Sequence, residues 1–353
     1  MTRELSYVLP LRWERDQGIA ELAAYLDALP ELVAEVLVVD GSPPARFAAN
    51  AASLPERARH IRPEPLGSLM GKVDGVLTGL RIASADAVIV ADDDVRWDEP
   101  ELRRASQLLD SAAVVRPQNY FDPLPWHARI DTARSLINRA CSFDLDLGPG
   151  DFPGTLAVRR SWLERTAGYD GDVMFENLEL MRTVAAAGGE VVTPLDLYVR
   201  RLPPTSRHYL SQRVRQAYDD FALPLRMAVW LMLLPLVALA PRRAGAAVAA
   251  LSTGVAEAGR RRAGGARVFA ASSAALAPVW VAERALCSWL AVWQRVRRGG
   301  IEYAGRRLPR SATPMRELRR RYGYAARAPV SSASLERTTG SGRSASPSAA
   351  PSA

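Results

Sequence analysis

The sequence predicts an α/β domain with a mostly parallel central sheet, followed by a helical membrane region. Short β-branched runs alternate with helix-length amphipathic segments from Leu5 to Val192, which is the order typical of a parallel sheet covered by helices. After Arg207, uncharged apolar stretches follow one another, and arginine-rich joints separate them. The charge divides at the same place, since residues 1–205 carry 22 basic and 31 acidic side chains while 206–353 carry 24 and 7.

The first half of the chain yields three strands and three helices in order. YVLPL predicts a first strand, and Gln17–Leu29 predicts a helix that Pro30 ends. EVLVVD predicts a second strand, and the apolar spacing of Leu69–Ser84 predicts a helix. DAVIVADDD is a third strand, and Pro100–Asp110 follows as a helix that starts at proline. Ligands of such sheets bind at the carboxyl ends of the strands, where Asp40 and the DDD triplet stand.

The carboxylate triplet Asp92–Asp94 is the strongest local indication of chemistry. Three adjacent carboxylates repel one another, so a buried strand that ends in this way is costly unless a cation lies nearby. Hard oxygen ligands of this type suit Mg²⁺ or Mn²⁺, usually shared with the phosphates of a substrate. The triplet therefore favours a divalent metal site, and the alternative is a solvated acidic loop.

The apolar stretches of the second half predict contact with a membrane. Each is shorter than the roughly 20 apolar residues that span a bilayer, although flanking arginines extend the reach of a helix. The expected topology is two crossings, 225–241 and 244–259, with 268–298 lying in or dipping into the interface. The alternative is a buried helical bundle.

The expected location is the cell membrane, as a multi-pass protein whose first domain lies in the cytoplasm. The N-terminus lacks the apolar core of a signal peptide, because charges resume directly after YVLPL. Cys141 and Cys287 are isolated, which excludes a disulfide framework and a structural zinc site. Nucleic acid is not an expected partner, because the arginines of the basic half are interleaved with apolar stretches rather than with a recognition motif.

Composition divides the chain into five parts. The last is rich in Ser, Ala and Pro and has almost no large apolar residues, which predicts disorder. The expected parts are the α/β domain at 1–205, a basic interfacial segment at 206–224, membrane helices at 225–298, a basic cytoplasmic segment at 299–325 and a disordered tail at 326–353.

Four elements together resemble the family 2 glycosyltransferases and their GT-A fold. They are the VVDGS turn, the helix GKVDGVLTGLRIASAD, the DxD of the triplet, and GTLAVRRSWLERTAGYDGDVMFENLELMRTVAAAGG, which looks like the acceptor-side strand, the "GGFD" turn and the "ED" helix. The resemblance covers about residues 5–200. It implies transfer of a sugar from a nucleotide-sugar donor, with Mg²⁺ or Mn²⁺ and with inversion at the anomeric carbon.

The resemblance also implies a donor site. Asp40 is expected to contact the nucleobase, Asp92 the ribose or the metal, and Asp94 the metal across the diphosphate. A metal would neutralise the charge that develops on the leaving nucleoside diphosphate. The nucleotide side is further expected to include Pro10, Arg12, Lys72 and Asp93. The alternative for Lys72 is an ordinary lysine on a helix surface.

The "ED" helix is expected to supply the general base that deprotonates the acceptor hydroxyl. The position usually filled by the second acid of the pair is Asn177, which cannot act as a base and is assigned to the acceptor side. Either Glu176 takes this role or Glu179 does, since the two lie on the same side of the helix. Glu176 is favoured.

The segment SQRVRQ resembles the QxxRW signature of processive and lipid-linked members of the family. Gln212 is expected on the acceptor side, and Arg215 is expected to contact the diphosphate. Gln216 stands where the signature has Trp, which weakens an assignment to polymer synthesis. The alternative is a basic helix that binds anionic lipid.

The sequence thus predicts a membrane-bound glycosyltransferase. The expected acceptor is lipid-linked, such as a polyprenyl phosphate, because the basic apolar half directly follows the catalytic helix. Two alternatives remain at this point, a processive polysaccharide synthase and a glycosyltransferase-like membrane scaffold without catalysis.

Overall fold

A seven-stranded sheet forms the centre of the computed structural model, which describes residues 4–141, 152–241 and 243–323. Strand β8 is antiparallel to its neighbours β4 and β6, and the other neighbouring strands are parallel, so the predicted mostly parallel sheet is confirmed. In spatial order the strands are β3 (Ala58–Ile61), β2 (Val33–Asp40), β1 (Leu5–Leu11), β4 (Ala87–Ala91), β8 (Thr155–Arg159), β6 (Val114–Val115) and β9 (Val191–Val192).

Helices cover both faces of this sheet. Side chains alternate along β1, so that Val8 packs in the core with α3 and α7, while Tyr7 and Leu9 pack in the core with α1 and α4. Both faces are therefore apolar, as the β-branched runs of the sequence require. The helices of this half are α1 (Ile19–Asp27), α2 (Pro44–Ala51), α3 (Gly71–Ile82), α4 (Glu99–Leu108), α6 (Arg160–Arg165) and α7 (Glu176–Ala186).

A second, three-stranded sheet lies beside the carboxyl end of β4. Its order is β5 (Val95–Arg96), β10 (Tyr198–Arg201) and β7 (Gln118–Phe121). Strand β10 runs antiparallel to β5, with Arg201 opposite Val95. This register brings the last residue of β10 next to the DDD triplet, although about a hundred residues separate them in the chain.

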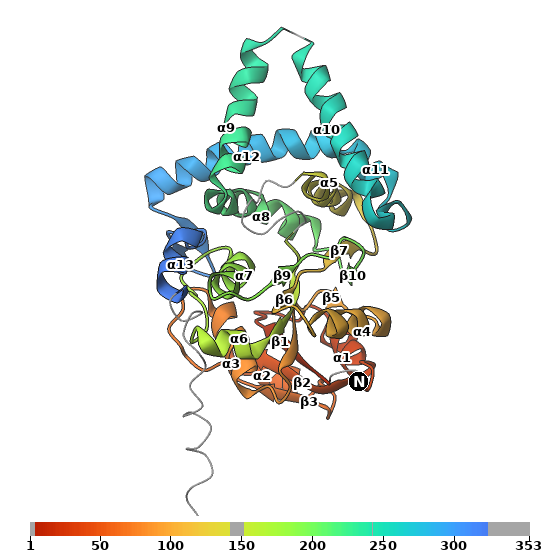
Figure 1. Ribbon diagram of the computed structural model, residues 1–353, viewed down its shortest axis with the longest axis vertical. Helices are drawn as coiled ribbons and strands as arrows, with labels where there is room; N and C mark the ends of the chain where they lie inside the picture. Colours follow the sequence, from red (N-terminus) through yellow and green to blue (C-terminus); the bar gives the residue numbers. More distant parts are fainter. Residues whose placement is uncertain (1–3, 142–151, 242, 324–353) are drawn as a thin grey trace, which may run out of the picture.

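The rest of the chain forms a helical layer above the sheets (Figure 1). Helix α12 runs across the molecule, and α9 and α10 rise from it as two arms (Figure 1). Trp230 of α9 packs edge-on against Trp280 of α12, with ring centroids 5.2 Å apart. The elements of the layer are α5 (Trp126–Ala140), α8 (Ser206–Tyr218), η1 (Asp219–Ala222), α9 (Pro224–Leu239), α10 (Ala244–Arg261), η2 (Arg262–Arg267), α11 (Ala271–Ala275) and α12 (Ala277–Arg298).

The predicted crossings at 225–241 and 244–259 are wrong, and so is the multi-pass membrane location. None of the helices in the described ranges combines the length and the apolar character needed to cross a bilayer. Helix α9 has 16 residues, or about 24 Å at about 1.5 Å per residue, against a hydrocarbon core of about 30 Å. Helix α10 has 18 residues but consists largely of Ala and Gly, and it ends in charged side chains.

The segment after α12 folds back onto the α/β half. It forms the hairpin β11 (Ile301–Tyr303) and β12 (Arg306–Leu308), followed by α13 (Met315–Tyr322), which packs on α7 through Met315 and Leu318. The described residues of the basic segment expected at 299–325, up to residue 323, therefore contribute to the surroundings of α7. The tail expected at 326–353 lies outside the described residues.

Candidate active site

The DDD triplet follows β4 at the edge where ligands of α/β sheets bind. The backbone N–H of Asp92 donates to the carbonyl of Gly154, 2.8 Å away, just before β8 begins. A Cβ at position 154 would lie 2.6 Å from Asp92 Oδ2 and 3.0 Å from the Arg201 guanidinium. A side chain at position 154 would therefore displace the Asp92 carboxylate or the Arg201 guanidinium.

Arg201 bridges the two outer carboxylates of the triplet. Its Nε lies 3.0 and 2.9 Å from the two oxygens of Asp94, and its Nη2 lies 3.5 Å from Asp92 Oδ2. The middle carboxylate turns elsewhere, since Trp13 Nε1 donates to Asp93 Oδ2. The DxD carboxylates thus converge on one position, and that position attracts a cation.

The triplet carries more negative charge than Arg201 compensates. Burial raises the pKa of Asp94 to about 6, and repulsion from Asp92 and Asp93 adds to it although Arg201 opposes the shift. Burial also raises the pKa of Asp93. Two converging carboxylates fit a divalent cation that takes its other ligands from a diphosphate and water. Within the described ranges, no group of three His, Cys, Asp or Glu side chains could hold a metal ion by itself.

Lys72 joins the triplet to the "ED" helix. Its Nζ lies 2.5 Å from Asp92 Oδ1 and 2.5 Å from Glu176 Oε1. Burial alone would lower the pKa of Lys72, but these two carboxylates raise it well above its usual range. Lys72 is thus part of a charged cluster with two of the predicted site residues, and not a lysine on an open helix surface.

The two candidate bases on α7 have different surroundings. Glu176, at the first position of the helix, faces Lys72, and burial raises its pKa while Lys72 opposes the shift. Glu179 is fully buried, and its Oε2 accepts a hydrogen bond of 2.6 Å from the backbone N–H of Thr313. Asn177 donates to the carbonyl of Pro153 and so ties the start of α7 to the chain before β8. Of the two acids, Glu176 is the one that the structure brings to the triplet.

Asp40, at the end of β2, is fully buried within a hydrogen-bond network. Its Oδ1 accepts from the backbone N–H of Ser42 at 2.8 Å, and its Oδ2 lies 2.8 Å from Asn50 Nδ2 and 3.0 Å from His60 Nε2. Burial opposes ionisation, but these hydrogen bonds lower the pKa of Asp40 to about 2. The carboxylate therefore fixes the turn after β2, and its contact with a nucleobase stays a prediction.

The other residues expected to bind the donor or acceptor contact residues other than the DDD triplet. Pro10 lies on β1, where a Cβ at Gly75 of α3 would approach its ring to 3.2 Å. Arg12 is exposed and pairs with Glu14 at 3.4 Å. Gln212 contacts His208 on α8. The Arg215 guanidinium stacks on the ring of Tyr303, 4.9 Å from its centroid.

Arg201 and Gly154 lie directly beside the triplet, and sequence reasoning did not single them out. Arg201 ends the short run YVRR, which carries the β-branched and aromatic residues of a strand but is only four residues long. Its partner is set by the register of β10 on β5, which no local pattern indicates. Gly154 opens GTLAVRR, where a glycine before a strand could have indicated a close backbone approach.

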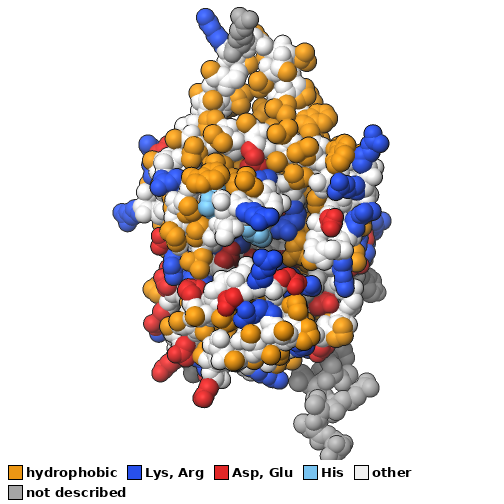
Figure 2. All heavy atoms as spheres, turned by 180° about the vertical axis from the view of Figure 1, so that it is seen from behind, with side chains coloured by type: hydrophobic (Ala, Val, Ile, Leu, Met, Phe, Trp, Pro, Cys, Tyr) orange, Lys and Arg blue, Asp and Glu red, His pale blue; other side chains and the backbone are white. Residues whose placement is uncertain are grey.

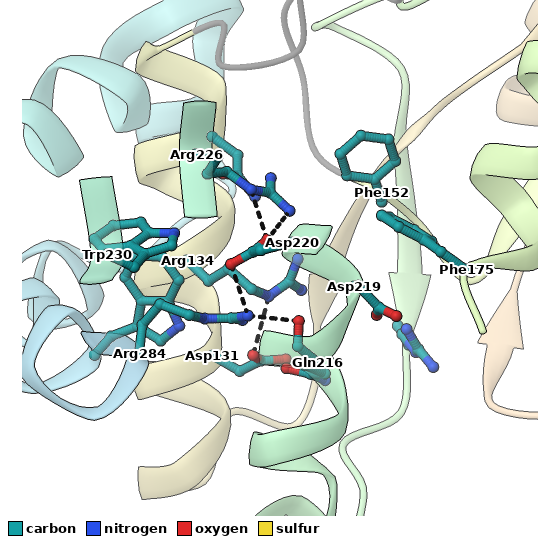
Figure 3. A pocket seen from close by; sticks show the side chains of 13 residues that line it. Asp131, Arg134, Phe152, Phe175, Gln216, Asp219, Asp220, Arg226, Trp230 and Arg284 are labelled. Atoms are coloured by element: carbon teal, nitrogen blue, oxygen red, sulfur yellow. Dashed lines mark hydrogen bonds and ion pairs between the residues drawn. The ribbon is translucent and has the colours of Figure 1, made fainter. Parts of the chain in front are cut away.

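A cavity lies in the helical layer and reaches Arg201. It has a volume of about 130 Å³, and its walls come from α5, α8, η1, α9 and α12 (Figure 3). Figure 3 shows Phe152 and Phe175 on one side of it and Trp230 and Arg284 on the other. Because Arg201 also binds the DxD carboxylates, the cavity and the triplet share one side chain.

Comparison with known proteins gives a family and a fold. Residues 15–166 match the family model of Glycosyl transferase family 2. The structure is similar to the mannosyltransferase PcManGT from Pyrobaculum calidifontis in complex with GDP-Man and Mn²⁺, with a TM-score of 0.51 and 18% identity over 84% of this chain and 88% of that chain. At this identity the likeness shows the fold alone. No curated protein sequence matches the chain.

Two further solved structures are similar to smaller parts of the chain. Glucosyl-3-phosphoglycerate synthase of M. tuberculosis has a TM-score of 0.40 and 18% identity over 61% of this chain and 78% of its own. S. aureus TarS 1-349 in complex with UDP-GlcNAc has a TM-score of 0.42 and 16% identity over 64% of this chain and 65% of its own. Neither score is high enough to add to the fold assignment.

Proposed function

We propose, on the match of residues 15–166 to the family model of Glycosyl transferase family 2, that the chain transfers a sugar from a nucleotide-sugar donor to a lipid-linked acceptor, with inversion. The predicted family and enzyme class are confirmed by that match; the donor chemistry, the site residues and the acceptor are proposals. The main observation behind the proposed donor site and base is the cluster at the carboxyl end of β4. In this cluster Lys72 contacts Asp92 and Glu176, and Arg201 contacts Asp92 and Asp94.

Asp92 and Asp94 are proposed to hold Mg²⁺ or Mn²⁺ together with the donor diphosphate. Their oxygens converge on the Arg201 guanidinium, and the raised pKa of Asp94 indicates an excess of negative charge there. A bound divalent ion would neutralise the charge that develops on the leaving nucleoside diphosphate. The mannosyltransferase of similar fold was determined with GDP-Man and Mn²⁺, which supports the assignment.

The nucleoside end of the donor is proposed to lie along the ends of β1 and β2. Asp40 holds the turn at Ser42 in place through the hydrogen bonds described above. Beside it, Phe47 stacks on His60 with ring centroids 4.0 Å apart, and the Arg62 guanidinium lies 4.0 Å from the Phe47 centroid. A turn fixed by an ionised, buried carboxylate gives the donor a rigid wall.

Glu176 is proposed as the general base that accepts the proton of an acceptor hydroxyl. A base must be ionised and must lie within reach of the nucleophile when donor and acceptor are bound. Lys72 stabilises the ionised form of Glu176 and keeps its carboxylate next to the donor-side acid Asp92. Glu179 is the less suitable candidate, because its Oε2 is engaged by the Thr313 backbone.

A lipid-linked acceptor is supported by the surface of the helical layer. Thirteen of the sixteen exposed large apolar side chains in the described part of the chain lie on α9, α10 and α12. Figure 2 shows that apolar side chains gather over this end of the molecule. A large exposed apolar surface next to a catalytic domain is typical of a site for an apolar partner, and here that partner would be the chain of the acceptor.

The experiment that tests the proposed function is turnover of a panel of nucleotide sugars with Mg²⁺ or Mn²⁺, followed by extraction of labelled lipid. We expect hydrolysis or transfer with at least one donor, and Asp94→Asn should reduce the metal-dependent rate at least about hundredfold. Asp98→Asn, which changes an acid shortly after the triplet, is the matched control and should retain the rate. Full metal-dependent activity in Asp94→Asn would overturn the assignment of the donor site.

A further inference from the structure

The cavity in the helical layer is lined by an unusual density of charge. Four arginines and three aspartates face it together with aromatic side chains. Asp220 lies between Arg226 and Arg284, at 2.5 and 3.4 Å (Figure 3). Asp131 lies 3.1 Å from both Arg134 and the neighbouring Arg213. Arg201, one of the four arginines, is paired with Asp94 and Asp92 outside the cavity, so three other guanidinium groups face three aspartates.

The buried arginines of this lining repel one another. Arg284 is 3% exposed, and burial lowers its pKa, with Arg213 and Arg226 contributing while Asp220 opposes the shift. Burial is the main cause of this lowered pKa, and the two neighbouring guanidinium groups add to it. An anion in the cavity would relieve this repulsion.

Two buried donors in the cavity wall have no acceptor among the described residues. They are Arg284 Nε and Trp280 Nε1, and the Trp280 side chain is 2% exposed. Buried N–H groups are almost always hydrogen-bonded, because an unpaired one loses its interaction with water without replacement. A ligand that offers several acceptor oxygens would satisfy both groups.

Near neutral pH, Asp219 opposes an anion in the cavity less than a fully ionised aspartate would. Burial raises the pKa of Asp219 to about 7, with Asp220 adding to the shift while Arg215, Arg284 and Arg226 oppose it. Its Oδ1 has no hydrogen-bond partner in the described part of the chain. A carboxyl that is partly protonated repels an anion less and can itself donate a hydrogen bond.

We propose that this cavity binds the phosphate group of the acceptor, with Arg226 and Arg284 as its principal ligands. The cavity of about 130 Å³ is similar in size to one of about 150 Å³ that holds a benzene molecule, so it accommodates a phosphate group but not a whole lipid. Planar guanidinium groups pair well with phosphate oxygens. Trp230 and Trp280 line the cavity from α9 and α12, so an attached apolar chain would continue toward the exposed apolar surface of these helices.

This inference rests on the proposed function in one respect, that the phosphate belongs to the acceptor of sugar transfer. Arg201 supports the connection, because it borders the cavity and also binds the DxD carboxylates. Phosphate binding itself is independent of turnover and can be measured without a donor sugar.

The first test is titration of the full chain with inorganic phosphate, followed by calorimetry and tryptophan fluorescence. A nucleoside diphosphate and Mn²⁺ are present in excess, so that the donor site is filled. We expect Arg284→Gln to weaken phosphate binding about tenfold or more, since one charged hydrogen-bond donor is lost. Arg297→Gln, on the same helix but exposed, should leave the affinity unchanged. Absence of phosphate binding by the unmodified chain would overturn the proposal.

If Arg284→Gln does not fold, a second variant, Asp219→Asn, still tests phosphate binding by the cavity. Asp219→Asn removes the one aspartate of the lining that forms no ion pair within 4.0 Å in the described residues. At about pH 8, above the pKa of about 7, the aspartate is ionised, and we expect its replacement to tighten phosphate binding several-fold. An affinity that stays the same or falls in Asp219→Asn would contradict the assignment.

The source of the phosphate is distinguished by comparing three probes. These are a polyprenyl phosphate in detergent, glycerol phosphate and inorganic phosphate. Tighter binding of the first identifies a lipid headgroup, and equal binding of all three identifies a site for soluble phosphate esters; both outcomes support a phosphate site. Donor turnover is measured in parallel. If phosphate binds but no nucleotide sugar is turned over, the proposed function fails while the phosphate site stands.

Discussion

Lys72 Nζ lies 2.5 Å from Glu176 Oε1, although 104 residues separate the two along the chain. The same ammonium group contacts Asp92 at 2.5 Å. One partly buried ammonium group therefore links the proposed metal-binding acid to the proposed base. This contact sets the position of the start of α7 relative to the end of β4, and it favours the ionised form of Glu176.

Replacing Lys72 should change the pH dependence of turnover as well as its rate. In Lys72→Gln the ionised form of Glu176 loses its partner, so the pKa of Glu176, already raised by burial, should rise further. The base would then be ionised only at higher pH. We expect kcat to fall about hundredfold and the acid limb of the pH–rate profile to move to higher pH. Arg81→Gln, on the exposed side of α3, should leave both unchanged; an unchanged profile in Lys72→Gln would show that the contact has no catalytic role.

Replacing Glu176 should mainly reduce activity, whereas replacing Glu179 should mainly reduce stability. Glu176→Gln should lower kcat by about 10² to 10⁴ because the base is lost. Glu179→Gln should retain kcat within a few-fold but lower the thermal midpoint, since Glu179 is fully buried and bonds Thr313. Steady-state kinetics and thermal unfolding of both variants measure these effects. If instead Glu179→Gln lost activity and Glu176→Gln retained it, Glu179 would be the general base.

Gly154→Ala should damage the site through a single methyl group. Its Cβ would lie 2.6 Å from Asp92 Oδ2, so the carboxylate or the strand must move. We expect at least a tenfold loss of activity and a destabilisation of about 1–3 kcal/mol. Gly245→Ala on α10 is the matched control, because its Cβ would meet no atom within 4 Å. It should be neutral or stabilise the fold by about 0.5–1 kcal/mol. Equal behaviour of the two variants would argue against a close approach at Gly154.

Acid should destabilise the protein through Asp40. Its pKa of about 2 in the folded state lies below the usual value of 3.8, so its ionised form adds stability that is present above about pH 4 and is lost as the pH falls toward 2. The contribution is about 2 kcal/mol, at about 1.4 kcal/mol for each pKa unit. Urea unfolding at several pH values measures it. Asp40→Asn should be less stable at pH 7 and should lose this part of the acid dependence, and a parallel loss of stability in both proteins would contradict the prediction.

New charges on the exposed apolar surface of α9 and α12 should weaken transfer to the acceptor without changing use of the donor. Leu239 on α9 is 87% exposed and Trp293 on α12 is 50% exposed, so Leu239→Glu and Trp293→Glu should fold normally. We expect transfer to a lipid-linked acceptor to fall about tenfold while hydrolysis of the nucleotide sugar is unchanged. Leu66→Glu, at an exposed apolar position before α3, serves as the control. Equal lipid transfer in all variants would remove the support for an acceptor that contacts this surface.

Local patterns in the sequence were sufficient to predict much of the secondary structure of the α/β half. The β-branched runs of β1, β2 and β4 identify strands buried on both faces, because few other structures use such runs in alternation with amphipathic helices. The acids that follow two of these strands, Asp40 and the DDD triplet, then mark the ligand edge. The order of motifs also indicated the family and the helix that carries Glu176.

The partners of these acids were decided by the tertiary structure. Arg201 reaches Asp94 through the register of β10 on β5. Lys72 reaches Glu176 because the chain before α3 is hydrogen-bonded to the turn before α7, from Leu69 N–H to Asp172 Oδ1 at 2.8 Å. Both relationships depend on contacts between segments about a hundred residues apart, such as the hydrogen bond from the Met70 N–H to the carbonyl of Gly171, and no local pattern encodes them. The choice between Glu176 and Glu179 follows from the same contacts, because the two acids share one side of the helix in sequence but meet different neighbours.

The apolar second half shows most clearly what the sequence alone determined and what it left open. Hydropathy established that helices with apolar faces follow the α/β domain, but a bilayer and the packed face of another helix select the same side chains. Only the folded chain shows Trp230 packed on Trp280, arginines buried with Asp220 around a cavity, and helices that are too short or too polar to cross a membrane. The sequence determined which segments are apolar, and the tertiary structure decided which of their side chains are packed and which form the exposed surface.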